Sequence, residues 1–130
     1  LCTGDTITHL ESNAEVQEFL QNCRELLADE GRLILGYRDL SDKKQNADRF
    51  IPVRSDDKRI LTCFLEYFEN HIQVHDIFHE NTGKGWVLKV SSYPKLILEE
   101  SHLQGLITKA GLYIHAMHKD GGMTHIVCTK

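Results

Sequence analysis

The sequence predicts an α/β fold: part of a sheet with parallel pairing and helices beside it, into which an antiparallel meander is inserted. Three observations support this. Apolar residues recur every three or four positions over 13–30, the period of an amphipathic helix. A nearly continuous apolar run at 32–37 follows at once, as in a buried strand of a parallel sheet. Over 60–98 short segments rich in β-branched and aromatic residues indicate antiparallel strands.

The first helix carries signals at both ends. Ser12 and Glu15 fit a capping box at its start, and Gly31 fits a left-handed residue that ends it. We expect the strand at 32–37 to be covered on both faces. A preceding strand would end at about residues 1–2, so that this helix and strand form the αβ half of a βαβ unit.

The polar segment 41–59, which contains Pro52, is expected to be an exposed loop. Three strands, a second helix and a terminal hairpin around Asp120-Gly121-Gly122 should follow. The expected ranges are 60–68, 72–80 and 86–98 for the strands, 100–110 for the helix, which Gly111 would end, and 112–119 with 123–129 for the hairpin.

Length and composition indicate one small globular domain: 130 residues, 41% hydrophobic and 26% charged. The formal charge of −4 without a basic stripe argues against nucleic acid as a partner. No apolar run is long enough to span a bilayer and no signal peptide is visible, so we expect no membrane contact. Four widely spaced cysteines favour buried thiols in a reducing compartment, which predicts a cytoplasmic location.

Two polar segments could carry chemistry, since ligands of open α/β sheets bind beyond the carboxyl ends of the strands. One is the loop 2–10, in which Gly4 allows close backbone approach and Asp5 and His9 offer charge and hydrogen bonds. The other is Tyr37-Arg38-Asp39, where an arginine can hold a carboxylate with two parallel hydrogen bonds. Alternatively, Asp5, Thr6 or Ser12 caps the first helix, and Arg38 with Asp39 forms a solvated pair.

His71, His75 and His79 do not form a metal site in this interpretation. In a strand they share one face, but each step of four residues covers about 13 Å, too far for ligands of one ion. A polar strand face is the better interpretation, and no metal is expected.

The run 2–10, the amphipathic helix and the step Leu26-Leu27-Ala28-Asp29-Glu30-Gly31-Arg32-Leu33-Ile34-Leu35 resemble the fourth to fifth strands of class I S-adenosylmethionine-dependent methyltransferases. The cysteine, the glycine and the His-Leu ending of the loop are similar to those of glycine N-methyltransferase and its sarcosine-methylating relatives. Ser91-Ser92-Tyr93-Pro94 is similar to a Ser-Tyr-Tyr-Pro step of those enzymes. The resemblance covers essentially the whole chain.

The resemblance implies a role for five residues. Thr3 and His9 would touch S-adenosylmethionine near its methionine and sulfonium end. Asp5 stands where the family has an asparagine that helps hold the amino-acid substrate, Arg38 matches the arginine that grips the substrate carboxylate, and Tyr93 matches a tyrosine near the reacting amine. A carboxylate at position 5 would attract an ammonium group, so a small amine or amino acid other than glycine is expected. None of these residues acts as a covalent nucleophile.

The fold class implied is the C-terminal part of a Rossmann-like methyltransferase sheet, with 41–98 as loop and inserted antiparallel strands. The family's glycine-rich turn and ribose-binding acidic residue do not occur in 1–130. We therefore expect a single partial domain, a fragment inactive alone, whose parent methylates a small molecule. The sheet edge near 33–37 would be unpaired and favour self-association or pairing with the missing half. The alternative is a non-enzymatic α+β small-ligand-binding or interaction module.

Overall fold

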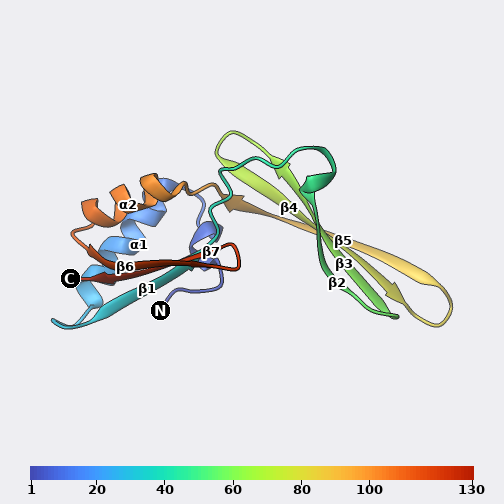
Figure 1. The fold of residues 1–130 in the computed structure, drawn as a ribbon, viewed down its shortest axis with the longest axis horizontal. Helices are drawn as coiled ribbons and strands as arrows, with labels where there is room; N and C mark the ends of the chain where they lie inside the picture. The colour runs from blue at the N-terminus through green and yellow to red at the C-terminus, as the bar shows by residue number, and fades with distance from the viewer. The chain divides into compact units, whose positions relative to one another are not determined.

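The computed structural model describes residues 1–130, which divide into two compact units (Figure 1). The first unit contains 1–42 and 96–130, and the second contains 43–95. The second unit therefore falls within the segment 41–98 in which the sequence predicts loop and inserted strands. Each unit has its own sheet.

The sheet of the first unit has the order β1-β7-β6, with antiparallel neighbours. Its strands are β1 (Arg32–Tyr37), β6 (Tyr113–Asp120) and β7 (Met123–Thr129). On the outer side of β1, Cys2 forms a parallel bridge: its N–H donates to the Ile34 carbonyl and its carbonyl accepts from the Gly36 N–H, both at 2.8 Å. The sequence predicts a strand that ends at about residues 1–2, and the structure has an isolated parallel bridge at Cys2.

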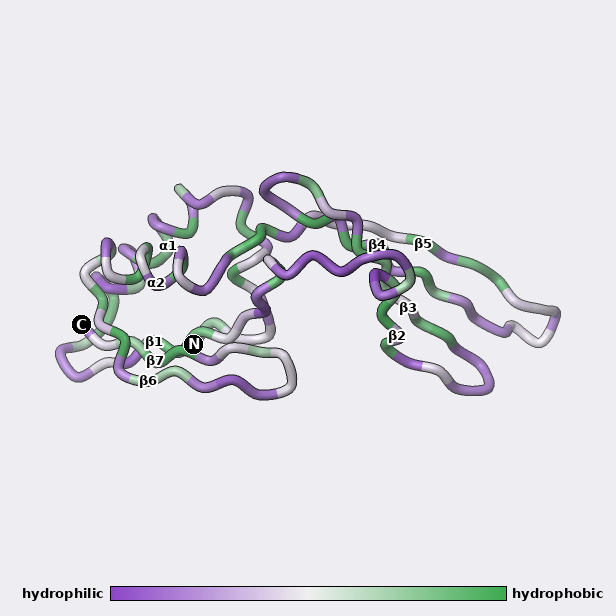
Figure 2. The backbone as a smooth tube through the Cα atoms, turned by 45° about the horizontal axis from the view of Figure 1, so that its top comes forward, coloured by the Kyte–Doolittle hydropathy of each residue, from purple (hydrophilic) through white to green (hydrophobic).

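Two helices, α1 (Asn13–Leu26) and α2 (Glu100–Lys109), lie on the same side of this sheet (Figure 1, Figure 2). The Ser12 side chain accepts a hydrogen bond from the Glu15 N–H, as the capping signal predicts. The Glu15 carboxylate completes the cap one residue earlier than expected, on the N–H of Glu11. Between sheet and helices lies the core, whose fully buried members include Val16, Leu20, Leu35, Tyr37, Leu98, Leu103, Ile107 and Ile126.

Two local predictions for this unit are wrong. β1 is covered on one face only: Leu33, Leu35 and Tyr37 face the core, whereas Ile34 is 37% exposed, because both helices lie on the same side of the sheet. The first helix also ends at Leu26, and Gly31 is not left-handed. Gly31 instead sits in a tight turn that follows the helix, where a Cβ would lie 3.0 Å from backbone atoms of Ala28.

The second unit is a four-stranded antiparallel sheet of order β2-β3-β4-β5. Its elements are η2 (Asn46–Arg49), β2 (Phe50–Ser55), β3 (Arg59–Tyr67), β4 (His71–Asn81) and β5 (Trp86–Leu96). The prediction of a loop throughout 41–59 is wrong, because β2 lies inside it. Pro52 is tolerated there because β2 is an edge strand, with a register shift against β3 between Pro52 and Arg54.

The expected fold class, α/β with an inserted antiparallel sheet, is confirmed. The second helix and the terminal hairpin match their predicted ranges to within two residues. Gly111 has the left-handed backbone (φ 76°) predicted for the end of α2. No helix is long and apolar enough to cross a membrane.

Candidate functional site

Asp5 connects the loop before α1 to the end of β1 by hydrogen bonds. Its carboxylate Oδ1 accepts a hydrogen bond from the Arg38 N–H at 2.8 Å, and its own N–H donates to the Gly36 carbonyl at 3.0 Å. Asp5 is 4% exposed and has a left-handed backbone (φ 68°), a conformation that aspartate tolerates better than most residues. The side chain forms no cap on η1 (Thr6–His9), the short helix that follows. Asp5 thus fixes the position of Arg38 through its backbone.

Arg38 is exposed, and its guanidinium lies against the β6–β7 turn. A Cβ placed on Gly122 would be 3.1 Å from Arg38 Nη1, and Gly122 itself has a left-handed φ of 75°. A turn built from glycines therefore leaves space for the arginine side chain next to the end of β1. We call this edge of the sheet, at the carboxyl end of β1, the rim. The guanidinium is available there for a carboxylate or a similar anion.

Thr3 and His9, the residues expected to touch a cofactor, are both exposed in the same loop. No other part of the chain lies within 4 Å of the position a Cβ on Gly4 would take. The backbone between Thr3 and Asp5 is therefore open to an approaching ligand.

His125 on β7 is a neighbour of this loop that the sequence analysis missed. A Cβ on Gly36 would lie 3.3 Å from His125 Nδ1 and 3.5 Å from Thr3 Cα, so the imidazole and Thr3 flank the same glycine. The available signal was Gly36 itself, because a glycine inside an apolar strand often marks a close approach of another group. The rim of the first unit thus gathers Thr3, Asp5, Arg38 and His125.

Tyr93 is half-buried in β5 and belongs to the second unit. Thr3, Asp5, His9 and Arg38 belong to the first unit. The structure therefore brings Asp5 and Arg38 together in one unit, with Thr3 and His9 in the loop that contains Asp5. The role of Tyr93 stays a prediction.

Asp39 caps α2 rather than pairing with its neighbour Arg38. Its Oδ2 accepts from the Glu100 N–H at 3.0 Å, and its Oδ1 accepts from the N–H and hydroxyl of Ser41 at 2.9 and 2.6 Å. Burial opposes ionisation of this carboxyl, but these hydrogen bonds outweigh it and lower the pKa of Asp39. Asp39 therefore joins the end of β1 to the start of α2.

Behind this cap lies the fully buried Tyr37. Burial raises the pKa of Tyr37, and the carboxylates of Asp39 and Glu100 raise it further. Lys119 forms an ion pair with the Glu100 carboxylate, with its Nζ 2.6 Å from Glu100 Oε2. The phenol is therefore neutral and serves packing, and it is poorly suited to proton transfer at neutral pH.

Two of the three histidines of β4, His71 and His75, make separate contacts. The His71 ring stacks on Phe68 with centroids 4.7 Å apart, and His75 Nε2 lies 2.9 Å from Glu66 Oε2. Nowhere in the chain do three or more histidine, cysteine, aspartate or glutamate side chains gather in a way that could hold a metal ion. All four cysteines are free thiols, and burial raises the pKa of Cys128 to about 11.

Comparison with known proteins identifies the fold. No family model and no curated protein sequence matches the chain. Solved structures do match: an S-adenosylmethionine-dependent methyltransferase from Clostridium acetobutylicum has a TM-score of 0.78 at 10% identity, over 98% of this chain and 56% of that one. The chain has the fold of the C-terminal part of such methyltransferases.

Two further structures agree. CalS10, an amino pentose methyltransferase from Micromonospora echinaspora with S-adenosylmethionine bound, has a TM-score of 0.81 at 14% identity, over 98% of this chain and 56% of that one. The sugar N-methyltransferase KedS8 from Streptoalloteichus has a TM-score of 0.69 at 10% identity, over 98% and 54%. The chain thus spans little more than half the length of these proteins, and at these identities the likeness concerns the fold.

Proposed function

We propose that this chain is the C-terminal part of an S-adenosylmethionine-dependent methyltransferase that acts on a small-molecule amine. The observation that carries the proposal is the Asp5–Arg38 hydrogen bond, which joins the loop before α1 to the end of β1. In an α/β sheet this is the rim at which ligands bind. The fold supports the same function, because its structural neighbours are methyltransferases.

Each rim residue has a defined task in this proposal. Thr3 and His9 hold the methionine and sulfonium end of S-adenosylmethionine, which supplies an already activated methyl group when bound. Arg38 binds and orients an acceptor that carries a carboxylate. Asp5 is buried and accepts a hydrogen bond from the Arg38 N–H, so it is a positioning residue that holds the loop before α1 against the end of β1. Catalysis of this kind rests mainly on placing the acceptor and excluding water.

The structural neighbours also bear on the chemical class of the methyl acceptor. Two structural neighbours are described as an amino pentose methyltransferase and a sugar N-methyltransferase. These descriptions support an amine other than glycine as the acceptor. Tyr93 would then lie near the reacting nitrogen, as the glycine and sarcosine N-methyltransferase resemblance implies.

We also propose a cytoplasmic location and no nucleic-acid partner. The four cysteines are unpaired, as expected in a reducing compartment. The formal charge is −4, and the chain has no continuous basic stripe. Association through the outer edge of β1 has little support, because residues 2–5 already bond to the backbone of Ile34, Gly36 and Arg38 along that edge.

The test is methyl transfer from radiolabelled S-adenosylmethionine to a panel of amino sugars, amino acids and simple amines. We expect the complete product of the coding region to transfer the label and the 130-residue chain to transfer none. Arg38→Gln should raise KM about tenfold for acceptors with a carboxylate and leave other amines unchanged. Arg32→Gln, at the opposite end of β1, is the matched control.

Two outcomes would contradict the proposal. Failure of the complete product to methylate any acceptor would leave a non-enzymatic ligand-binding or interaction module as the better account. Equal effects of Arg38→Gln and Arg32→Gln would show that the rim does not bind the acceptor.

A further inference from the structure

A polar pocket lies in the second unit, between the segment that precedes β2 and the end of β3. It is a hollow of about 440 Å³, within the size range of small-ligand sites. Figure 2 shows the segment before β2 as hydrophilic. We call this hollow the lysine pocket, and its lining consists of Lys43, Lys44, Gln45, Asn46, Arg49, Glu66 and Tyr67.

Hydrogen bonds give the wall of the lysine pocket a defined conformation. The Lys44 N–H donates to the Tyr67 hydroxyl at 3.2 Å, which fixes the loop against β3. At the start of η2 the Asp48 N–H donates to the Gln45 carbonyl at 3.0 Å, and Asn46 takes the left-handed backbone (φ 47°) that turns the chain. The pocket is therefore formed before a ligand arrives, which reduces the entropy cost of binding.

Arg49 is held by contacts that leave part of its guanidinium free. The guanidinium lies over the Phe64 ring, 4.9 Å from the centroid, and its Nε–H donates to the Asn46 carbonyl at 3.4 Å. These contacts occupy one face of the guanidinium and its Nε, so the two Nη groups can donate to a ligand. An arginine held in this way loses little side-chain entropy when it binds an anion.

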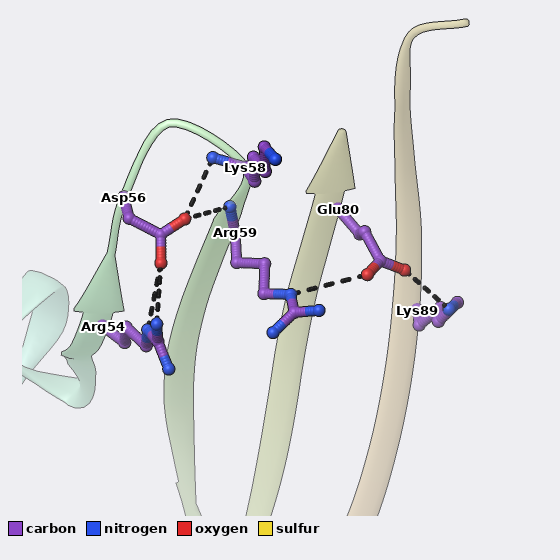
Figure 3. A network of polar contacts seen from close by, with 6 residues as sticks. All are labelled: Arg54, Asp56, Lys58, Arg59, Glu80 and Lys89. Carbon is purple, nitrogen blue, oxygen red and sulfur yellow. Dashed lines mark hydrogen bonds and ion pairs between the residues drawn. The ribbon is translucent and has the colours of Figure 1, made fainter. Parts of the chain in front are cut away.

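The lysines of the pocket differ from the cations at the opposite end of β3. There, Glu80 pairs with Arg59 at 3.5 Å and with Lys89 at 3.1 Å, so one carboxylate neutralises two cations (Figure 3). Lys43 and Lys44 are both exposed, and neither forms an ion pair. Their like charges repel each other, and a bound anion would relieve that repulsion.

The lining of the lysine pocket carries an excess of positive charge. Three of its side chains are cationic, and Glu66 is the one carboxylate, which gives a net charge of +2. Glu66 is already engaged, because its Oε2 lies 2.9 Å from His75 Nε2. A phosphate monoester carries about −1.5 to −2 at neutral pH, so it matches this charge better than a singly charged carboxylate does.

The donors of the pocket also suit phosphate oxygens. A lysine ammonium is a compact charge with three donors and is a common ligand of phosphate, and the Arg49 guanidinium adds planar donors. The Tyr67 hydroxyl accepts from the Lys44 N–H, so its own proton is free to reach a ligand. Nucleic acid and anionic membranes require a longer stripe or a larger cluster of cations than these three.

We propose that the lysine pocket binds the phosphate group of a small molecule. Lys43 and Lys44 neutralise the phosphate, and Arg49 and Tyr67 donate hydrogen bonds to its oxygens. None of these residues belongs to the rim, so phosphate binding in this pocket does not depend on methyl transfer.

The test is isothermal titration calorimetry of the complete product of the coding region with inorganic phosphate, at low ionic strength and without S-adenosylmethionine or a methyl acceptor. Lys43→Gln and Lys44→Gln, introduced together, should raise the Kd for phosphate about tenfold, because they remove two of the three cations. The matched control is Lys58→Gln with Lys84→Gln, which changes the charge equally at exposed turn lysines of the same unit. It should leave the Kd unchanged.

Glycerol 3-phosphate and a single-stranded oligonucleotide distinguish the sources of the phosphate. We expect glycerol 3-phosphate to bind at least as tightly as inorganic phosphate, with the same dependence on Lys43 and Lys44. Absence of phosphate binding, or equal effects of the two double variants, would overturn the proposal. So would tighter binding of the oligonucleotide that depends on the same two lysines. All four substituted lysines are exposed, and far-UV circular dichroism checks that both double variants are folded.

Discussion

Replacing Asp5 by alanine removes the hydrogen bond that joins the loop to β1. The bond is 2.8 Å long and its acceptor is a carboxylate that is 4% exposed. Hydrogen bonds to charged groups contribute about 1.5–3 kcal/mol, so we expect a loss of about 2 kcal/mol from this contact. The left-handed backbone (φ 68°) adds about 1 kcal/mol, because alanine tolerates it less well than aspartate.

Two companion substitutions separate these contributions. Asp5→Asn keeps an acceptor oxygen and the tolerance for a left-handed backbone, so it should cost about 1 kcal/mol. Asp5→Gly loses the acceptor but relieves the backbone, so it should cost about 2 kcal/mol. Asp29→Ala, at an aspartate whose side chain is fully exposed, is the control and should change the free energy of unfolding by less than about 0.5 kcal/mol.

The assay is urea unfolding followed by far-UV circular dichroism, with linear extrapolation to water. Circular dichroism is needed because the single tryptophan lies in the second unit and does not report on the loop. An Asp5→Ala variant as stable as the unsubstituted chain would refute the structural role of this carboxylate. So would equal losses for Asp5→Asn and Asp5→Ala.

Three further predictions concern the first unit. Because the pKa of Asp39 is lowered, its contribution to stability is present above about pH 3.8 and is lost as the pH falls below that value. Asp39→Asn should therefore flatten the acid limb of a curve of stability against pH. An unchanged acid limb would contradict the role of Asp39 as the cap of α2. Because the pKa of Tyr37 is raised in the folded chain, the unfolded chain loses the phenol proton first and stability should fall above about pH 10. Tyr37→Phe should reduce that fall, whereas Tyr113→Phe, at an exposed tyrosine, should not. Identical alkaline curves for the two variants would contradict this prediction. Gly111→Ala should destabilise the chain by about 1–2 kcal/mol because Gly111 has a left-handed φ of 76°. Gly105→Ala, at an exposed position inside α2, should stabilise the chain by about 1 kcal/mol. Thermal unfolding should therefore show shifts of the midpoint temperature of opposite sign for the two variants.

The sequence predicted those parts of the fold that depend on local patterns. The period of α1, the Ser12 cap and the glycines of the terminal hairpin all act over a few residues, and the structure agrees with each of them. The segment containing β2 was assigned to a loop because Pro52 and the surrounding charges suppress the strand pattern. That strand depends on pairing with β3, which no local pattern contains.

The candidate site was predictable in part. The position of Asp5 and Arg38 at one rim follows from the order of strand, loop and strand. That Asp5 bonds to the backbone of Arg38, and that Asp39 caps α2 instead of pairing with Arg38, depends on contacts between segments far apart in the chain. His125 was missed because its approach to Gly36 follows from the antiparallel register of β1 and β7.

The sequence encoded immediately upstream of Leu1 tests the central claim most directly. The account predicts a glycine-rich strand-turn-helix within roughly 100 residues, with an acidic residue about 20 positions further on, since these groups would hold the nucleotide part of S-adenosylmethionine. An unrelated domain there, or a stop codon, would contradict the assignment to a methyltransferase.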